Sequence, residues 1–316
     1  MKILVTGSAG FIGFHLSKSL LDDGYEVLGI DNINDYYDPK LKLARLDQLK
    51  PYKNFKFEKV DIADRESITQ SFQSFKPNKV INLAAQAGVR YSIENPYAYV
   101  RSNLVGFLNI IELCRHNDVE GFIYASSSSV YGGNTKTPFS VDDRVDNPIS
   151  LYAASKKSNE LIANAYSHLY GLHTTGLRYF TVYGPWGRPD MAMFIFTKKI
   201  LAGQPIPVFN QGKMKRDFTY IDDIVSGTRS AIEKNYKCEI FNLGNHRSEH
   251  LMDMISIIEK ELTKKAKIDF QPMQPGDVTE SFAEIQYSID KLGFEPKQSI
   301  KDGIPHLISW YKDYYG

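Results

Sequence analysis

Short apolar runs alternate with amphipathic stretches along more than half of the chain. Residues 3–5 and 27–30 are almost entirely apolar, which is typical of parallel strands buried on both faces. Between them, Leu16, Leu20 and Leu21 follow a helical spacing. Further strands are predicted at residues 55–60, 80–85, 122–125 and 174–179, and helical patterns lie at 96–113 and 151–170. This alternation predicts the α/β class, with a doubly wound parallel sheet.

The pattern changes after Thr181, where residues 184–189 form a loop rich in turn-forming residues. Shorter elements are predicted beyond it: helices at 191–201, 222–233 and 251–262, strands at 206–209, 240–243 and 268–271, and a final helix. The strand at 240–243 is expected to return to the first sheet. We therefore expect one domain over residues 1–180, with a returning segment near 218–246, and a smaller interleaved domain over 181–316.

A glycine-rich turn follows the first strand. Gly7, Gly10 and Gly13 give the spacing GxxGxxG between a strand and a helix, and the second strand ends at Asp31. In such a unit the glycines let the backbone approach a pyrophosphate, and the acid binds the adenosine ribose. No Arg stands beside Asp31 to receive a 2′-phosphate, so the turn favours NAD over NADP. The simpler interpretation is a glycine-rich turn of any α/β protein.

Tyr152 and Lys156 are four residues apart in a helical pattern and therefore project from one helix face. A nearby ammonium group favours the phenolate form of a tyrosine. The pair is thus a candidate base for a substrate hydroxyl. The run at residues 126–129 consists of four serines after a predicted strand, and it could bring a hydroxyl beside the phenol. The alternative is an amphipathic helix with a solvated lysine.

The amino-acid composition argues against several classes of protein function. The 316 residues are 42% hydrophobic with a net charge of +1, so the chain can bury a large core and does not favour nucleic acid as a partner. Cys114 and Cys238 are far apart in the sequence, which suggests neither a disulfide framework nor a metal site. No apolar stretch reaches the ~20 residues of a membrane span. We expect a cytoplasmic protein that does not associate with membranes.

Five motifs together resemble the extended short-chain dehydrogenase/reductase family that acts on nucleotide sugars. They are GxxGxxG, the run SSSSVYG from Ser126, YxxxK from Tyr152, RYFTVYGP from Arg178 and RDFTYIDD from Arg216. The resemblance covers essentially the whole chain, and residues 142–190 are most similar to UDP-glucuronate 4-epimerases. It implies a Rossmann domain that binds NAD, followed by a domain that binds a UDP-sugar.

The resemblance also implies roles for individual residues. Tyr152 is the expected base, Lys156 binds the nicotinamide ribose and lowers the phenol's pKa, and Ser127 bridges Tyr152 and the sugar O4. Ser128 or Ser129 could share the bridging role. The residues expected to line NAD are Gly7, Gly10, Phe11, Ile12, Gly13, Asp31, Asn32, Asp61, Ile62, Leu83, Ala84, Ala85, Tyr152, Lys156 and Tyr179.

On the substrate side, the resemblance implies that Arg216 meets the diphosphate, Phe209 flanks the uracil and Asp277 binds the uridine ribose. Many relatives have Asn where Thr181 stands, and Arg near Gln274. We expect Thr181 and Arg188, with Ser128 and Ser129 opposite, to hold a sugar carboxylate. The alternative for Arg188 is a solvated surface charge, and for Thr181 a β-branched residue at a strand end.

The implied reaction inverts C4 of a UDP-hexuronic acid through a transient 4-keto sugar, without net redox change. Other readings remain open: a 4-epimerase of UDP-N-acetylglucosamine or UDP-glucose, a dehydratase or decarboxylase, and a non-enzymatic NAD-binding protein. A dehydratase would place an acid beside the catalytic hydroxyl, where Ser128 and Ser129 stand. Relatives imply a homodimer formed through the YxxxK helix and the helix before the fifth strand.

Overall fold

The chain is built around a parallel sheet, as the alternating pattern predicts. The fold is that of a computed structural model, which describes residues 1–273 and 278–316. Within these residues the sheet has seven strands in the order β11-β6-β5-β4-β1-β2-β3, and every neighbouring pair is parallel. The strands are β1 (Lys2–Thr6), β2 (Glu26–Asp31), β3 (Phe55–Lys59), β4 (Lys79–Asn82), β5 (Gly121–Ser127), β6 (Thr174–Tyr179) and β11 (Cys238–Leu243).

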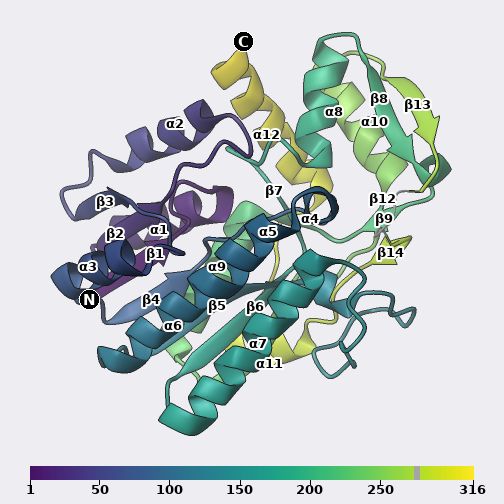
Figure 1. Ribbon diagram of the computed structural model, residues 1–316. Helices are drawn as coiled ribbons and strands as arrows, with labels where there is room; N and C mark the ends of the chain where they lie inside the picture. Colours follow the sequence, from purple (N-terminus) through teal and green to yellow (C-terminus); the bar gives the residue numbers. More distant parts are fainter. Residues whose placement is uncertain (274–277) are drawn as a thin grey trace.

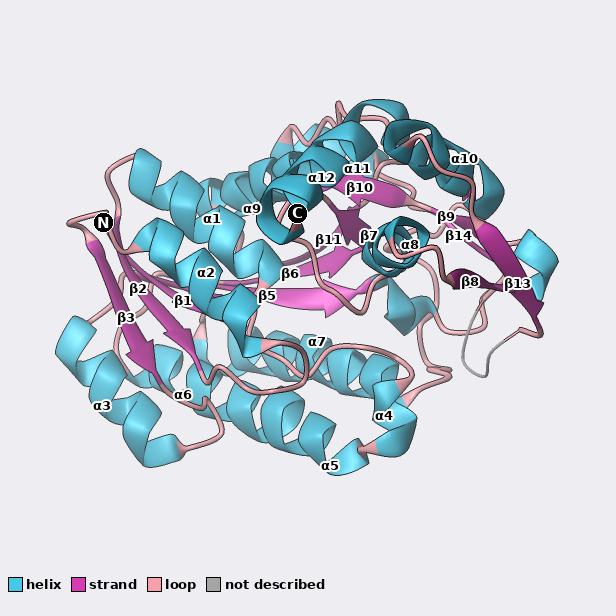
Figure 2. Cartoon of the chain, turned by 90° about the horizontal axis from the view of Figure 1, so that it is seen from above, coloured by secondary structure: helices cyan, strands magenta, loops and turns pink. Residues whose placement is uncertain are grey.

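Helices cover both faces of this sheet (Figures 1 and 2). One face carries α1 (Phe11–Asp22), α2 (Pro39–Leu49) and α9 (Ile221–Lys234). The other carries α3 (Arg65–Phe75), α6 (Phe107–His116) and α7 (Leu151–Tyr170). A continuous helical run leads into α6 through α5 (Pro96–Tyr99) and the π-helical η1 (Val100–Gly106), and the short α4 (Tyr91–Glu94) precedes it. The fold is therefore the doubly wound one that the sequence predicts.

The helix boundaries follow local capping rules. The side chain of Ser150 accepts a hydrogen bond from the Ala153 amide at the start of α7, and Gly171 ends the helix with a φ of 71°. Asp64 caps α3 and Asp38 caps α2 in the same way. The sequence analysis did not predict α2 or α3, although Leu41, Leu46 and Leu49 of α2 and Ile68, Phe72 and Phe75 of α3 are buried and lie at helical spacing.

Most of the remaining elements form a second region beside the carboxyl ends of the strands, whereas α11 (Gln286–Leu292) packs on α9 and β11 of the main sheet (Figure 1). Here β8 pairs with β13, β10 with β7, and β9 lies between β12 and β14. The elements are η2 (Ser128–Tyr131), β7 (Thr181–Tyr183), α8 (Ala192–Leu201), β8 (Pro205–Phe209), η3 (Asn210–Gly212), β9 (Lys215–Arg216), β10 (Phe218–Tyr220), β12 (Glu249–His250), α10 (Leu251–Leu262), β13 (Lys267–Gln271), β14 (Glu280–Ser281) and α12 (Ile300–Tyr315).

Apolar clusters lie on both sides of the main sheet. Ile3 and Val5 of β1 enter one cluster and Leu4 enters the other, as expected for a strand buried on both faces. A third cluster contains Leu41 and Trp310, and it joins α2 to α12. No helix among the described residues is both long and apolar enough to cross a membrane.

One buried arginine connects the two regions. Arg45 of α2 is 0% exposed. Its Nη1 donates to the carbonyl oxygen of Ala9 at 2.9 Å, and its Nε donates to that of Trp186 at 3.1 Å. Its Nη2 donates to the carbonyl oxygen of Gly187 at 3.1 Å. Arg45 therefore ties the 184–190 loop to the glycine-rich turn.

Candidate active site

The predicted site segments meet at the carboxyl-terminal edge of the sheet. The glycine-rich turn follows β1, Asp31 ends β2, Ala84 and Ala85 follow β4, and Ser127 ends β5. Because the strands are parallel, these ends lie at one edge, where α/β proteins bind their ligands. Helix α7 packs beside β5 and brings Tyr152 to the same edge.

Tyr152 and Lys156 lie one turn apart on α7, as predicted. Lys156 is 4% exposed, and its Nζ donates to the carbonyl oxygen of Ala125 at 2.8 Å. The Nζ lies 6.0 Å from the centroid of the Tyr152 ring. Burial raises the pKa of Tyr152, whereas a hydrogen bond with Ser127 and the charge of Arg188 lower it. The groups that oppose the effect of burial are thus Ser127 and Arg188, not Lys156, to which the resemblance gave that role.

The buried ammonium of Lys156 predicts a pH dependence of stability. Burial lowers the pKa of Lys156 from 10.5 to about 8. Between these values the unfolded chain binds a proton that the native chain lacks, so the free energy of unfolding rises with pH there. Below the lower value the cost of burying the charge is fully present. Lys156→Met should therefore stabilise the cofactor-free protein near pH 7 by roughly 2–3 kcal/mol, and this difference should shrink towards pH 10.

Denaturant unfolding of both proteins across this pH range measures the difference. Lys157→Met is the matched control, because the Lys157 side chain is 21% exposed. Its effect should not vary in the same way with pH. A stability difference for Lys156→Met that is independent of pH would contradict the assignment.

The serine run has a defined register. The Ser126 hydroxyl donates to Oε1 of Glu160 at 2.6 Å, so it points to α7 one turn beyond Lys156. The Ser127 hydroxyl is close enough to Tyr152 to lower the pKa of that phenol, and it accepts from the Ser129 amide at 3.2 Å. Ser128 and Ser129 are half-buried and begin the turn η2. Of the candidate serines, Ser127 is therefore the one in contact with Tyr152.

The glycine-rich turn is shaped for close approach of backbone segments. Gly7 has a φ of +74°, and a Cβ there would lie 2.8 Å from the Ala84 nitrogen. A Cβ at Gly13 would lie 2.0 Å from the Gly7 oxygen, so neither position admits a side chain. Helix α1 starts at Phe11 after Gly10, which has no side chain to cap it. Its first amide groups suit an anion such as a pyrophosphate.

Asp31 has basic neighbours that the sequence reading did not foresee. The carboxylate is 9% exposed and accepts from the Ile33 amide at 2.8 Å. Burial raises the pKa of Asp31, while the charges of Lys42 and Arg45 lower it. Both cations come from α2, the helix missing from our prediction. The Nζ of Lys42 donates to the Asn34 side chain at 2.7 Å.

The other residues expected to line NAD lie at the same edge. Asn32 accepts from the Asn34 amide at 3.1 Å, and Asp61 accepts from the Ala63 amide at 2.9 Å. The Tyr179 hydroxyl lies 2.9 Å from Thr228 Oγ1 in the core, which leaves its main chain for the crevice. The segments that contain the remaining candidates are Phe11–Ile12 at the start of α1, Ile62 after β3, and Leu83–Ala85 after β4.

Arg188 lies in the site and is not a solvated surface charge. Its side chain is 24% exposed, and its Nε donates to Oδ1 of Asp190 at 3.0 Å. Asp190 also accepts from the Tyr36 hydroxyl at 3.1 Å. The charge of Arg188 is close enough to Tyr152 to lower its pKa. A cation paired with an internal carboxylate therefore lies beside the candidate base.

The other candidate substrate residues are spread along the second region. Thr181 begins β7 and is half-buried. Phe209 ends β8, and the Arg90 guanidinium lies over its ring at 4.6 Å from the centroid. Arg216 of β9 donates to the carbonyl oxygen of Lys215 at 2.8 Å. Asp277 lies outside the described residues.

Sequence reasoning missed four polar residues at the site. Tyr36 and Asp190 contact Arg188 or its partner, and Glu160 and Arg178 contact each other beneath the serine strand. Glu160 stands four residues after Lys156, which puts it on the same helix face. This four-residue spacing is the sequence feature that could have placed Glu160 near the site. Nothing in the sequence pairs Tyr36 with a residue 154 positions away.

The geometry agrees with comparisons to known proteins. The chain is 47% identical over 333 residues to UDP-glucuronate 4-epimerase 4 of Arabidopsis thaliana, which covers 100% of this chain and 76% of that protein. Its fold matches a UDP-glucuronic acid 4-epimerase from Bacillus cereus, solved in complex with UDP-glucuronic acid and NAD. The TM-score is 0.94, with 36% identity over 100% of both chains.

A UDP-glucose 4-epimerase of Thermotoga maritima, solved with UDP-glucose, is also similar. Its TM-score is 0.92, with 31% identity and coverage of 100% of both chains. The sequence profile described as "NAD dependent epimerase/dehydratase family" matches residues 3–244. The chain therefore belongs to the NAD-dependent epimerase/dehydratase family.

Proposed function

We propose that this protein is an NAD-dependent UDP-glucuronate 4-epimerase, which interconverts UDP-glucuronate and UDP-galacturonate. Relatives of that name match the chain over its whole length. The observation that carries the proposal is the placement of Arg188, a cation that can receive a carboxylate, beside the Tyr152–Ser127 pair. Arg188 already pairs with Asp190, and a uronate carboxylate would give it a second anionic partner that a neutral sugar lacks.

The residues present fit the cofactor. The uncapped start of α1 suits a pyrophosphate, and the buried Asp31 carboxylate suits ribose hydroxyls. When bound at these residues, NAD would supply the hydride acceptor and donor for C4 of the sugar. Lys156, whose Nζ is fixed on Ala125, lies where it can also bind the nicotinamide ribose.

The chain's own residues move the proton. Tyr152 removes the proton of the sugar O4 as C4 is oxidised, and returns it when C4 is reduced. Ser127 hydrogen-bonds the Tyr152 phenol and can contact O4 at the same time. Tyr152 gains this proton when C4 is oxidised and gives it back when C4 is reduced, so the base is regenerated in each cycle.

A neutral UDP-hexose is the second candidate substrate, supported by the similarity to a UDP-glucose 4-epimerase. A dehydratase is disfavoured, because Ser128 and Ser129 stand where an acid would be needed. Incubation with UDP-glucuronate, UDP-glucose and UDP-N-acetylglucosamine, with products identified by NMR, tests the proposal. Fastest turnover of a neutral sugar would refute the uronate assignment and leave the epimerase chemistry intact.

The same proposal includes the domain boundaries, the roles of the other substrate-binding residues and the location of the protein. Residues 1–180 with 218–246 form the cofactor-binding domain, and 181–316 form the substrate domain. Asp277, Phe209 and Arg216 hold the UDP group, and Thr181, Ser128 and Ser129 assist Arg188. The protein acts in the cytoplasm.

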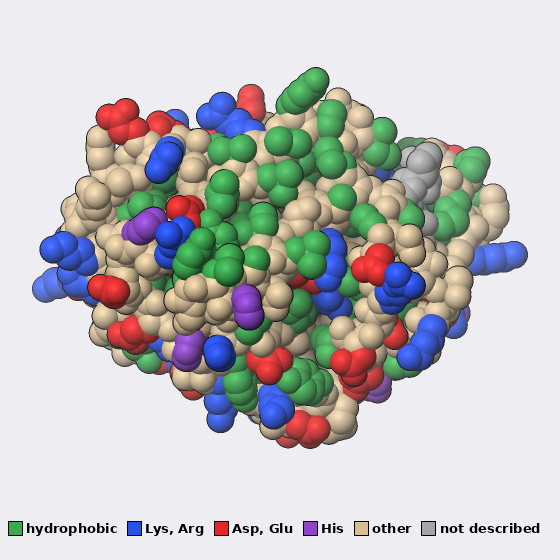
Figure 3. Space-filling model, turned by 60° about the horizontal axis from the view of Figure 1, so that its bottom comes forward, with side chains coloured by type: hydrophobic (Ala, Val, Ile, Leu, Met, Phe, Trp, Pro, Cys, Tyr) green, Lys and Arg blue, Asp and Glu red, His purple; other side chains and the backbone are tan. Residues whose placement is uncertain are grey.

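We also infer a homodimer through α6 and α7. These neighbouring helices expose Leu108, Leu161 and Leu169, with the last 64% exposed. Figure 3 shows one face of the molecule on which apolar side chains gather. Two such helix pairs can pack as a four-helix contact, which hides this surface. Sedimentation should give a dimer for the native chain and a monomer for Leu161→Glu/Leu169→Glu.

A further inference from the structure

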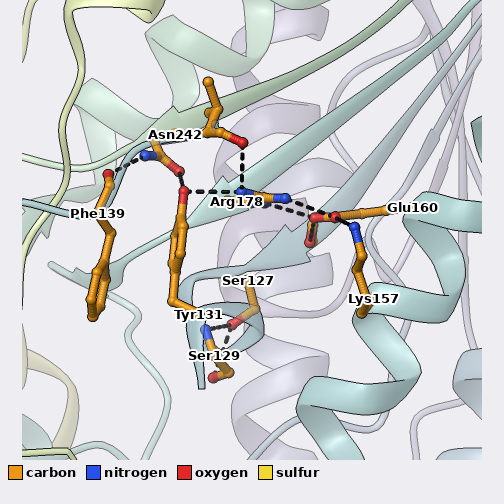
Figure 4. Close-up of polar contacts among 10 residues, drawn as sticks. Ser127, Ser129, Tyr131, Phe139, Lys157, Glu160, Arg178 and Asn242 are labelled. Atoms are coloured by element: carbon orange, nitrogen blue, oxygen red, sulfur yellow. Dashed lines mark hydrogen bonds and ion pairs between the residues drawn. The ribbon is translucent and has the colours of Figure 1, made fainter. Parts of the chain in front are cut away.

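A buried polar row crosses three neighbouring strands below the active site (Figure 4). Ser126 of β5 is in register with Arg178 of β6, and Arg178 with Asn242 of β11. Arg178 and Ser126 are each 2% exposed, and Asn242 is 0% exposed. Side chains in register on adjacent parallel strands point to the same face of the sheet.

Tyr131 connects two members of this row. Its hydroxyl donates to Asn242 Oδ1 at 2.6 Å and accepts from Arg178 Nη1 at 3.0 Å. Asn242 in turn donates to the carbonyl oxygens of Phe139 at 2.8 Å and Glu284 at 3.0 Å. Arg178 is therefore held in one orientation by groups from separate parts of the chain.

Glu160 of α7 contacts two members of this row, Arg178 and Ser126, from the helix that covers the sheet. Arg178 binds its carboxylate with two hydrogen bonds, from Nε at 2.8 Å and from Nη2 at 2.9 Å. The Ser126 hydroxyl donates to the same carboxylate at 2.6 Å. Burial acts to raise the pKa of Glu160, but the contacts with Arg178 outweigh it and the pKa is lowered. The pair is therefore ionised at neutral pH.

The row lies next to the residues that carry the proposed chemistry. Three consecutive residues of β5 contact three successive turns of α7. The Ala125 oxygen accepts from Lys156, Ser126 donates to Glu160, and Ser127 lies close enough to Tyr152 to lower the pKa of its phenol. These polar contacts resist sliding or rotation of the helix against the strand.

Stability alone does not account for an ion pair at this depth. Two charges buried in a core cost desolvation energy, and apolar residues of similar volume often serve stability as well or better. Apolar contacts are not directional, so an apolar pair at these positions would not define one register between the helix and the strand. A misplacement of about 1 Å in reacting groups can cost roughly a hundredfold in rate.

We propose that Glu160 and Arg178 are a positioning pair, which fixes the register of α7 against β5 and so sets the contact between the Ser127 hydroxyl and the Tyr152 phenol. The proposal rests on the proposed roles of Ser127 and Tyr152. Neither Glu160 nor Arg178 touches the substrate. Both act through the two residues that do.

The double variant Glu160→Met/Arg178→Met separates positioning from stability. It should remain folded and no less stable, with its bound dinucleotide retained and its KM nearly unchanged, while kcat falls about tenfold. Its Tyr152 should also titrate at higher pH, because the hydrogen bond from Ser127 lowers the pKa of that phenol. The titration is read from tyrosinate absorbance, as the difference between each protein and its Tyr152→Phe counterpart. This readout needs no substrate.

Lys157→Met is the matched control: Lys157 also contacts Glu160, at 3.2 Å, but from the exposed side. It should leave kcat and the titration unchanged. If the double variant does not fold, Ser126→Ala should give a smaller loss of kcat with the same direction of titration shift. A native kcat and a native Tyr152 titration in whichever variant folds would overturn the proposal. A shifted titration in a protein that turns over no UDP-sugar would instead refute the proposed function.

Discussion

Tyr152→Phe should lower turnover by at least ~100-fold, the loss expected when a general base is removed. The substitution deletes one hydroxyl and keeps the ring that packs against Tyr99 at 6.1 Å between centroids. Lys156 keeps its contact with the Ala125 oxygen, so the dinucleotide should stay bound. Initial rates with UDP-glucuronate, together with absorbance of the released dinucleotide, measure both effects.

Tyr170→Phe is the control for this change. Tyr170 is the last residue of the same helix and is 46% exposed, so removing its hydroxyl should leave the rate unchanged. A Tyr152→Phe protein with near-normal activity would remove Tyr152 from the mechanism.

Arg188→Ala should reduce kcat/KM for both sugars, because the charge of Arg188 lowers the pKa of Tyr152, but the loss for UDP-glucuronate should exceed the loss for UDP-glucose by roughly 10- to 100-fold. A charge-assisted hydrogen bond contributes about 1.5–3 kcal/mol, and each 1.4 kcal/mol is about tenfold. The 4-keto form of a uronic acid is a β-keto acid, which readily loses carbon dioxide. A carboxylate no longer held by Arg188 should therefore also release some UDP-pentose, which NMR of the products detects.

Two further variants make this test specific. Arg144→Ala removes an arginine whose side chain is 85% exposed, and it should have no effect. Asp190→Asn keeps the guanidinium but removes its internal counter-charge, so the preference for the uronate should persist. Equal losses with UDP-glucuronate and UDP-glucose in Arg188→Ala would show that Arg188 does not recognise the carboxylate.

The main sheet and the catalytic helix could be predicted because local patterns specify them. The limits of α7 and β6 match the predicted 151–170 and 174–179, and Ser150 and Gly171 mark the two ends of α7. The family followed from five motifs whose spacing is set by backbone geometry. In these segments, the secondary structure that the local sequence favours is the one that the packed fold contains.

The contacts between distant segments could not be predicted. Arg188 was read as either a ligand or a surface charge, because Tyr36 and Asp190 are brought to it only by the fold. The basic residues beside Asp31 come from α2, which our sequence analysis did not predict, and only the fold brings that helix to the end of β2. Glu160 and Arg178 are 18 residues apart, and only the pairing of α7 with β6 makes them partners.

Arg45 gives the protein a means of communication between its two binding regions. A single rigid guanidinium holds Ala9 of the glycine-rich turn and Trp186 and Gly187 of the loop that leads to Arg188. Thermodynamic coupling between two sites is reciprocal. A ligand that orders the glycine-rich turn would therefore favour one arrangement of the loop. A ligand that binds the loop would favour the ordered turn by the same free energy. Under the proposed function, a substrate that binds the loop would therefore also favour retention of the dinucleotide at the glycine-rich turn.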